Sequence, residues 1–245
     1  MPAPSWWLPR AASSRVVLPA LLGLAAFAGI TATHAGAPGA ATPDDGQRHF
    51  SKAETLLWQT DHLANIRRPS RLRYRYTKTG TAEEQHTDVI DLEVLRVHPD
   101  GRKGVQVHYF TGKQEKPVPE QDPVTGNPVL AVYLQADVYA MNRRTEGGWR
   151  YFHRAIKTAL AATNTVEPVG LDFHGRKVPA SRVTITPYAG DAKRLPLKAY
   201  AHTTYAFTFA DAVPAQLYEI RSFVPQPDGA PLIEEILTFV ESKDR

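Results

Sequence analysis

The chain has 245 residues, contains no cysteine, and carries 29 basic and 25 acidic side chains. The absence of cysteine excludes thiol catalysis, disulfide exchange and cysteine metal sites. The excess of positive charge is small, and nucleic-acid binding would need basic residues gathered on one face. We therefore expect no nucleic-acid partner.

The first 35 residues have the parts of a secretory signal peptide. Arg10 and Arg15 precede an apolar run over 16–30, which is too short and too interrupted by proline and glycine to be a stable spanning helix of ~20 residues. Small residues follow, and cleavage is expected near Ala35, with a retained membrane anchor as the alternative. The protein left after cleavage would be periplasmic or secreted, with 210 residues and a net charge of +2.

The segment after the signal predicts a flexible leader over 36–48, because it is rich in Gly, Ala, Pro and Asp and has little to bury. A single domain is expected over 49–245, since a chain of this length can form one sizeable core. Its first element is a predicted helix over 52–65. Ser51 and Glu54 have capping-box spacing, and apolar residues then recur at helical intervals.

Next come three predicted strands, over 71–76, 88–97 and 104–111, joined by turn residues near Gly80 and Gly101 into an antiparallel meander. In the first strand arginines alternate with apolar side chains, which indicates one wet and one dry face. The proline-rich segment 113–127 predicts a surface loop.

A helical pair is predicted after this loop. Asn127 and Pro128 suit a helix start, and the second helix is expected over 149–162. The inward stripe expected for the first helix is Val129, Val132, Tyr133, Ala136, Tyr139 and Ala140. Five further strands are predicted over 165–173, 176–188, 199–210, 215–224 and 232–240. About eight strands with segregated helices indicate an α+β fold built on a curved antiparallel sheet.

No catalytic or metal motif stands out. The histidines lack the short spacings that place two imidazoles on one metal, no serine lies in a nucleophile elbow, and there is no glycine-rich phosphate loop. We expect no metal, no cofactor and no catalytic residue, and we favour a non-enzyme. An enzyme is kept as a third hypothesis, with a site assembled from His108, His202 and Asp137.

Aromatic and aliphatic side chains indicate a possible binding site more clearly than the polar residues do. They fall on one face of their strands, or on the helix that would cover this face. The candidate ligand-binding residues are Leu72, Tyr74, Tyr76, Val107, Tyr109, Tyr133, Tyr205, Phe207 and Phe209. Tyrosine suits either a core or a pocket wall. This face is therefore either a filled core or an apolar pocket beneath a movable helical lid.

A basic surface is expected on the helical pair, formed by Arg143, Arg144, Arg150, Arg154 and Lys157. Such a group can make transient contact with anionic lipid at a membrane surface or with an acidic partner. The alternative is a solvated helix face without a partner.

The order of these elements resembles the lipoprotein-carrier (LolA/LolB-like) superfamily, including RseB-like half-barrels. The resemblance covers residues 50–240 and rests on architecture and on segments such as RLRYRYTKTG and YAFTFADAVPAQLYEIRSFV. It implies an unclosed antiparallel half-barrel with an N-terminal helix and an inserted helical pair on its concave face. The arginine that holds the lid in this family matches Arg71, Arg73 and Arg75 equally, and the long loop 113–127 departs from the compact carriers.

Three hypotheses follow for the function. The leading one is a periplasmic binding or carrier protein for a hydrophobic ligand, such as a lipid, an acyl chain or a lipoprotein. The alternative is an envelope interaction or sensor protein with a filled core, and the third is the enzyme described above. The oligomeric state stays open.

Overall fold

A computed structural model describes residues 49–191, 198–227 and 229–245. Arg48–Arg245 form one folded unit. The expected signal peptide with its cleavage point, and the expected leader, lie outside the described residues. Within the described ranges, no helix is both long and apolar enough to cross a membrane.

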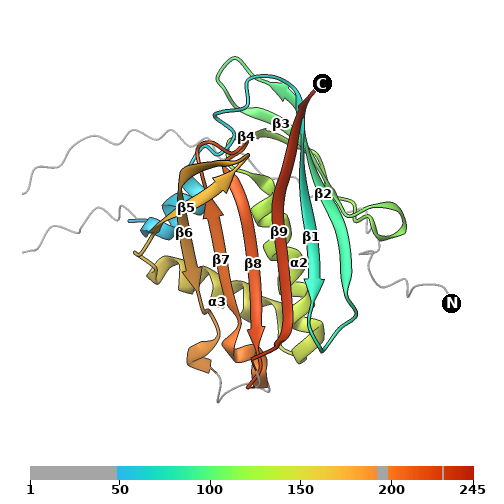
Figure 1. Ribbon diagram of the computed structural model, residues 1–245, viewed down its shortest axis with the longest axis vertical. Coiled ribbons are helices and arrows are strands. Elements are labelled where there is room, and N and C mark those ends of the chain that lie inside the picture. The colour runs from blue at the N-terminus through green and yellow to red at the C-terminus, as the bar shows by residue number, and fades with distance from the viewer. Residues whose placement is uncertain (1–48, 192–197, 228) are drawn as a thin grey trace, which may run out of the picture. The chain divides into compact units, whose positions relative to one another are not determined.

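A nine-stranded antiparallel sheet dominates the fold (Figure 1). Its strands are β1 (Ser70–Thr79), β2 (His86–Val97), β3 (Lys103–Tyr109), β4 (Gln121–Val124), β5 (Glu167–Phe173), β6 (Arg176–Ile185), β7 (Thr204–Phe209), β8 (Leu217–Pro225) and β9 (Pro231–Asp244). The order across the sheet is β4-β3-β2-β1-β9-β8-β7-β6-β5. The last strand therefore joins the two meanders by pairing with β1 and β8. Since β4 and β5 are edges, the sheet does not close, and the expected α+β fold with an unclosed antiparallel sheet is confirmed.

The alternation in β1 sets which side of the sheet is dry. Leu72, Tyr74 and Tyr76 are buried, while the arginines between them lie on the other face. The expected turns at Gly80 and Gly101 have φ angles of 130° and 86°, which glycine adopts without strain.

One strand was not expected. The segment 113–127 is not only a loop, because β4 pairs with β3 within it. Pro123 lies inside β4 and is tolerated there, since β4 is an edge strand.

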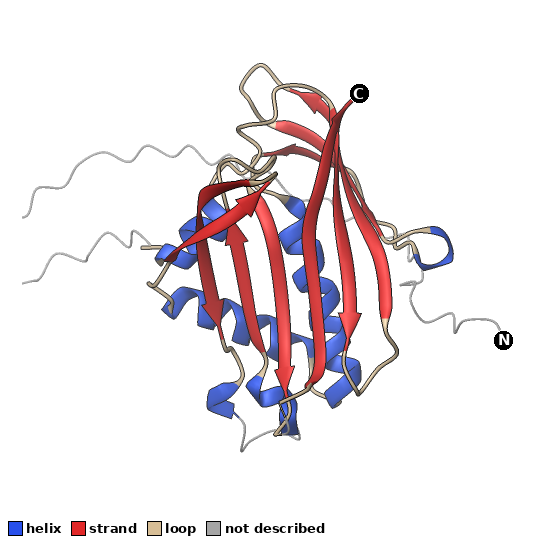
Figure 2. Cartoon of the chain, in the orientation of Figure 1, coloured by secondary structure: helices blue, strands red, loops and turns tan. Residues whose placement is uncertain are grey.

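Two long helices lie together on one side of the sheet (Figure 2). They are α2 (Pro128–Thr145) and α3 (Trp149–Ala162), and they match the expected pair. The inward stripe expected for α2 is partly wrong, because Tyr139 is exposed whereas Leu130, Leu134 and Val138 are buried. The helix is rotated from the expected orientation because apolar residues occur on more than one of its faces.

The N-terminal helix is shorter than expected. It comprises α1 (Lys52–Glu54) and a π turn, η1 (Thr55–Gln59), and ends where Thr60 becomes extended. Beyond it, the backbone N–H of Leu63 donates to the carbonyl of Thr125 instead of continuing the helix. The other short elements are the 3₁₀ helices η2 (Gly112–Gln114), η3 (Ala189–Asp191) and η4 (Lys198–His202).

Candidate functional site

Of the nine candidate ligand-binding residues, eight are buried on the inner face of the sheet, and the ninth, Tyr133, is buried on α2, which covers that face (Figure 2). They come from β1, β3, α2 and β7, and none is more than 5% exposed. All nine belong to one hydrophobic core that also contains Val129 and Leu130 of α2. The aromatic face is therefore covered by the protein's own side chains in this state.

The start of α2 is fixed to the inner face by Asn127. Its side-chain oxygen accepts from the backbone N–H of Val129, and its amide donates to the Tyr74 hydroxyl at 2.9 Å. The backbone N–H of Asn127 donates to Nδ1 of His62, which is fully buried. Burial lowers the pKa of His62, although its hydrogen bond to the Leu56 carbonyl opposes this. His62 thus serves here as a neutral acceptor.

The middle of α2 brings an acid to the same face. Asp137 accepts a hydrogen bond of 2.5 Å from the hydroxyl of Tyr205, which in turn lies 3.2 Å from the hydroxyl of Tyr188. Burial, and next the nearby charge of Glu235, raise the pKa of Asp137 to about 7. Asp137 therefore takes up a proton near neutral pH without leaving the core.

At the end of α2, Arg144 bridges the helix and the sheet. Its guanidinium donates to Glu83 and to Glu235, each at 2.7 Å, and its side chain is only 10% exposed. Burial alone would raise the pKa of Glu83, but hydrogen bonds from Arg144 and Lys78 outweigh this and lower it to about 2. The assignment of Arg144 to the basic surface is wrong, because these two carboxylates hold it inward. The exposed members of that set are Arg143, Arg150, Arg154 and Lys157.

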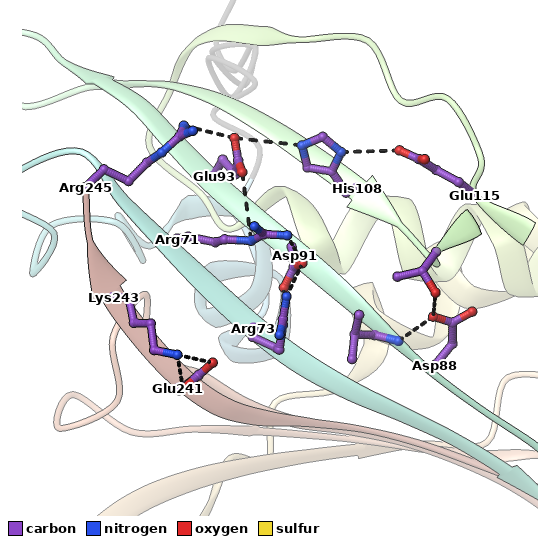
Figure 3. A network of polar contacts seen from close by, with 12 residues as sticks. Arg71, Arg73, Asp88, Asp91, Glu93, His108, Glu115, Glu241, Lys243 and Arg245 are labelled. Atoms are coloured by element: carbon purple, nitrogen blue, oxygen red, sulfur yellow. Dashed lines mark hydrogen bonds and ion pairs between the residues drawn. The ribbon is translucent and has the colours of Figure 1, made fainter.

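The three arginines matched to the lid-holding position lie on the opposite, outer face of the sheet. Arg71 and Arg73 both donate to Asp91, at 2.5 Å and 2.8 Å (Figure 3). Burial would raise the pKa of Asp91, but these two hydrogen bonds lower it. Arg75 is exposed on the same face. The contact between helix and sheet that the resemblance implied is made instead by Arg144.

The hypothetical enzyme site is not assembled. His108 lies on the outer face with Glu93 and Glu115 (Figure 3), whereas Asp137 is buried on the inner face. His202 is exposed in η4. Within the described part of the chain, no three His, Asp or Glu side chains are grouped so that they could hold a metal ion.

A groove lies between the N-terminal helix, α2 and α3, and we call it the helical groove. Its volume is about 390 Å³. The apolar residues that line it are Phe50, Trp58, Ala131, Leu134, Val138, Ile156 and Leu160, and the polar ones are Glu54, Gln135, His153 and Lys157. Each element contributes residues at helical spacing, so one stripe of each helix faces the groove.

Large apolar side chains mark this groove. Phe50 is 44% exposed and Trp58 is 41% exposed, and they are two of the four large hydrophobic residues that are exposed among those described. Removing such side chains from water is favourable, and exposed apolar surface gathered in one place marks binding sites.

The N-terminal helix, which forms the third wall of the helical groove, is fixed to α3. The hydroxyl of Ser51 donates to the Leu160 carbonyl at 2.7 Å, and the N–H of Ala53 donates to the Thr163 carbonyl. The predicted capping box is present, with Glu54 accepting from the backbone of Ser51. These contacts hold the N-terminal helix in place, so the groove is preformed.

Three other surface hollows among the described residues have volumes of about 370 to 460 Å³. None of these four hollows is lined by any of the nine inner-face residues, and the helical groove is the most apolar of the four. Sequence reasoning did not find it. The available signal was that Leu134 and Val138 are apolar but fall outside the inward stripe expected for their helix.

The chain was compared with known proteins by sequence and by structure, and only the structural comparison gave matches. No protein-family model matches the sequence, and no curated protein matches it. The structure is similar to that of the lipoprotein LppX of Mycobacterium tuberculosis, with 10% identity over 71% of this chain and 87% of that one, and a TM-score of 0.31. It is also similar to a LolA superfamily protein from Nitrosomonas europaea, with 7% identity over 79% and 93% of the two chains and a TM-score of 0.22.

Proposed function

We propose that this chain is an extracytoplasmic binding or carrier protein for a hydrophobic ligand, and that the ligand lies in the helical groove. The observation that carries the proposal is a preformed groove with an apolar floor and two exposed aromatic residues. Its volume of about 390 Å³ falls within the range of roughly 300–1,000 Å³ that is usual for small-molecule sites. The apolar run after Arg15 supports export.

The helical groove favours a ligand with an acyl chain. Each methylene removed from water contributes about 0.8 kcal/mol, so a chain laid along the apolar floor binds without covalent chemistry. A ligand on the inner face would first have to displace α2 from the sheet. The hydrogen bonds of Asn127 and Asp137 and the ion pairs of Arg144 oppose that movement. The nine inner-face residues are therefore proposed as a second location, open only when α2 moves.

Tryptophan quenching tests the location of the ligand. Trp58 lines the groove, whereas Trp149 is exposed outside it; Trp6 and Trp7 lie in the expected signal peptide. In the exported chain, we expect a brominated fatty acid to quench the Trp149→Phe variant saturably, because its remaining Trp58 touches the ligand. The Trp58→Phe variant should show little quenching. Fluorescence titration of both variants measures this.

Each variant serves as the other's control, since both substitutions keep an aromatic ring at an exposed position. Equal quenching of both variants would indicate adsorption to the surface. No quenching of either would mean that the groove does not bind acyl chains.

An interaction protein is the second candidate, and one observation favours it. Tyr139 and Trp149 are exposed outside the groove with ring centroids 6.4 Å apart, and the guanidinium of Arg150 lies over the Trp149 ring. Aromatic residues and arginine are enriched at protein interfaces. The quenching experiment separates the two candidates, because a protein with a filled core and no lipid site gives no saturable quenching.

A further inference from the structure

Two basic side chains on the wall of the helical groove have no acidic partner. His153 and Lys157 are exposed on the groove side of α3, and neither has an ion-pair or hydrogen-bond partner among the described residues. The one acid that lines the groove, Glu54, is buried, and its carboxylate accepts from the backbone of Ser51. An anionic group on the groove wall would therefore meet the ammonium of Lys157, which has no competing acid among the described residues.

A second observation concerns Gln135 on α2. Its side chain lines the groove, and its Nε2 is buried without a hydrogen-bond partner among the described residues. A buried amide donor left unpaired costs free energy, and such a group calls for an explanation. A ligand oxygen, reached by a turn of the Gln135 side chain, supplies the missing acceptor.

Volume limits the ligand further. With about 390 Å³, the groove lies near the lower end of the usual range for ligand sites, so it suits one acyl chain better than two. A fatty acid has one chain, and its carboxylate has two oxygens. One oxygen can meet the ammonium of Lys157 while the other accepts from Gln135.

We infer that the ligand of the helical groove is a long-chain fatty acid, with its carboxylate held by Lys157 and Gln135 and its chain on the apolar floor. This inference rests on the proposed function, because it names the class of ligand that the same groove takes. It requires no reaction: the carboxylate replaces water at the exposed ammonium of Lys157 and supplies the acceptor that the Gln135 amide lacks.

The test compares a brominated fatty acid with the brominated alcohol of the same chain length, using quenching of Trp58 in the exported Trp149→Phe protein. We expect the acid to bind roughly ten- to a hundredfold more tightly than the alcohol, since hydrogen bonds to charged groups contribute more than neutral ones. In that background, Lys157→Met should remove most of this preference, because the acid loses a charged partner and the alcohol loses at most a weaker hydrogen bond. Arg154→Met, an exposed change on the same helix outside the groove, should keep the preference.

The outcomes separate this inference from the proposed function. Equal affinity for acid and alcohol in the parent protein would overturn the carboxylate site and leave the groove as an acyl-chain site. Binding of neither ligand would overturn the proposed function itself. A preference that survives in Lys157→Met would exclude Lys157 as the carboxylate ligand. Circular dichroism of each variant confirms that the fold is kept.

Discussion

An Arg144→Met variant should lose about 3 to 5 kcal/mol of unfolding free energy, the usual cost of removing one partner from a buried ion pair. The guanidinium lies between Glu83 and Glu235, and the side chain of Glu235 is only 7% exposed. Without Arg144, Glu235 is a buried charge that has lost this partner, close to the buried acid Asp137. Urea unfolding followed by circular dichroism measures the loss.

Two further variants sharpen this test. Arg154→Met removes an exposed arginine from α3 and should change stability by no more than about 0.5 kcal/mol. The double variant Arg144→Met, Glu235→Met removes both charges, so it should be more stable than Arg144→Met alone. An Arg144→Met protein as stable as the parent would show that α2 is not held to the sheet by this ion pair.

An Asp137→Asn variant should change how stability depends on pH. Burial and the charge of Glu235 raise the pKa of Asp137 to about 7 from an ordinary value of 3.8. Its protonated form therefore contributes stability that is fully present below pH 3.8 and is lost as pH rises through about 7. Asparagine stays neutral and keeps an oxygen for the Tyr205 hydroxyl. As pH rises, the unfolding free energy of the variant should therefore increase relative to that of the parent. The total increase is about 4 kcal/mol, at about 1.4 kcal/mol per pKa unit.

The measurement is the difference in unfolding free energy between variant and parent from about pH 4 to about pH 9, a window that spans the titration of a buried carboxyl. Taking the difference cancels titrating groups that do not interact with Asp137, including His62, whose lowered pKa acts in the opposite direction. Asp172→Asn, an exposed change on β5, should give curves parallel to the parent. Parallel curves for Asp137→Asn would mean that Asp137 is already ionised in the folded protein at acid pH.

Much of the fold could be predicted because local patterns dictate it. The alternation of arginine and apolar residues in β1 can be satisfied only by a sheet with one dry face, and Asn127 with Pro128 starts α2 as expected. The predicted elements were wrong where tertiary contacts determine the local structure. The N-terminal helix stops at Gln59 because the backbone beyond it bonds to Thr125. The strand β4 is short, contains a proline, and exists only because β3 pairs with it.

The site was less predictable than the fold, for a physical reason. Period-two alternation places Tyr74 and Phe207 on the inner face, but whether that face is empty depends on how the side chains of α2 fill it. From the sequence alone, Arg144 resembles the other surface cations. Its burial depends on Glu83 and Glu235, which are distant in sequence and form ion pairs with it in the folded chain. The helical groove needs three helices in a fixed arrangement, and no single segment contains that information.

Photocrosslinking tests the location of the ligand most directly. A photoreactive fatty acid, bound to the protein without residues 1–35, is activated by light, and the labelled peptides are identified by mass spectrometry. Labels should fall on α2 and α3 at groove residues such as Leu134 and Ile156. Labels confined to Tyr74, Phe207 or their neighbours on β1 and β7 would contradict a ligand in the groove and place it beneath α2.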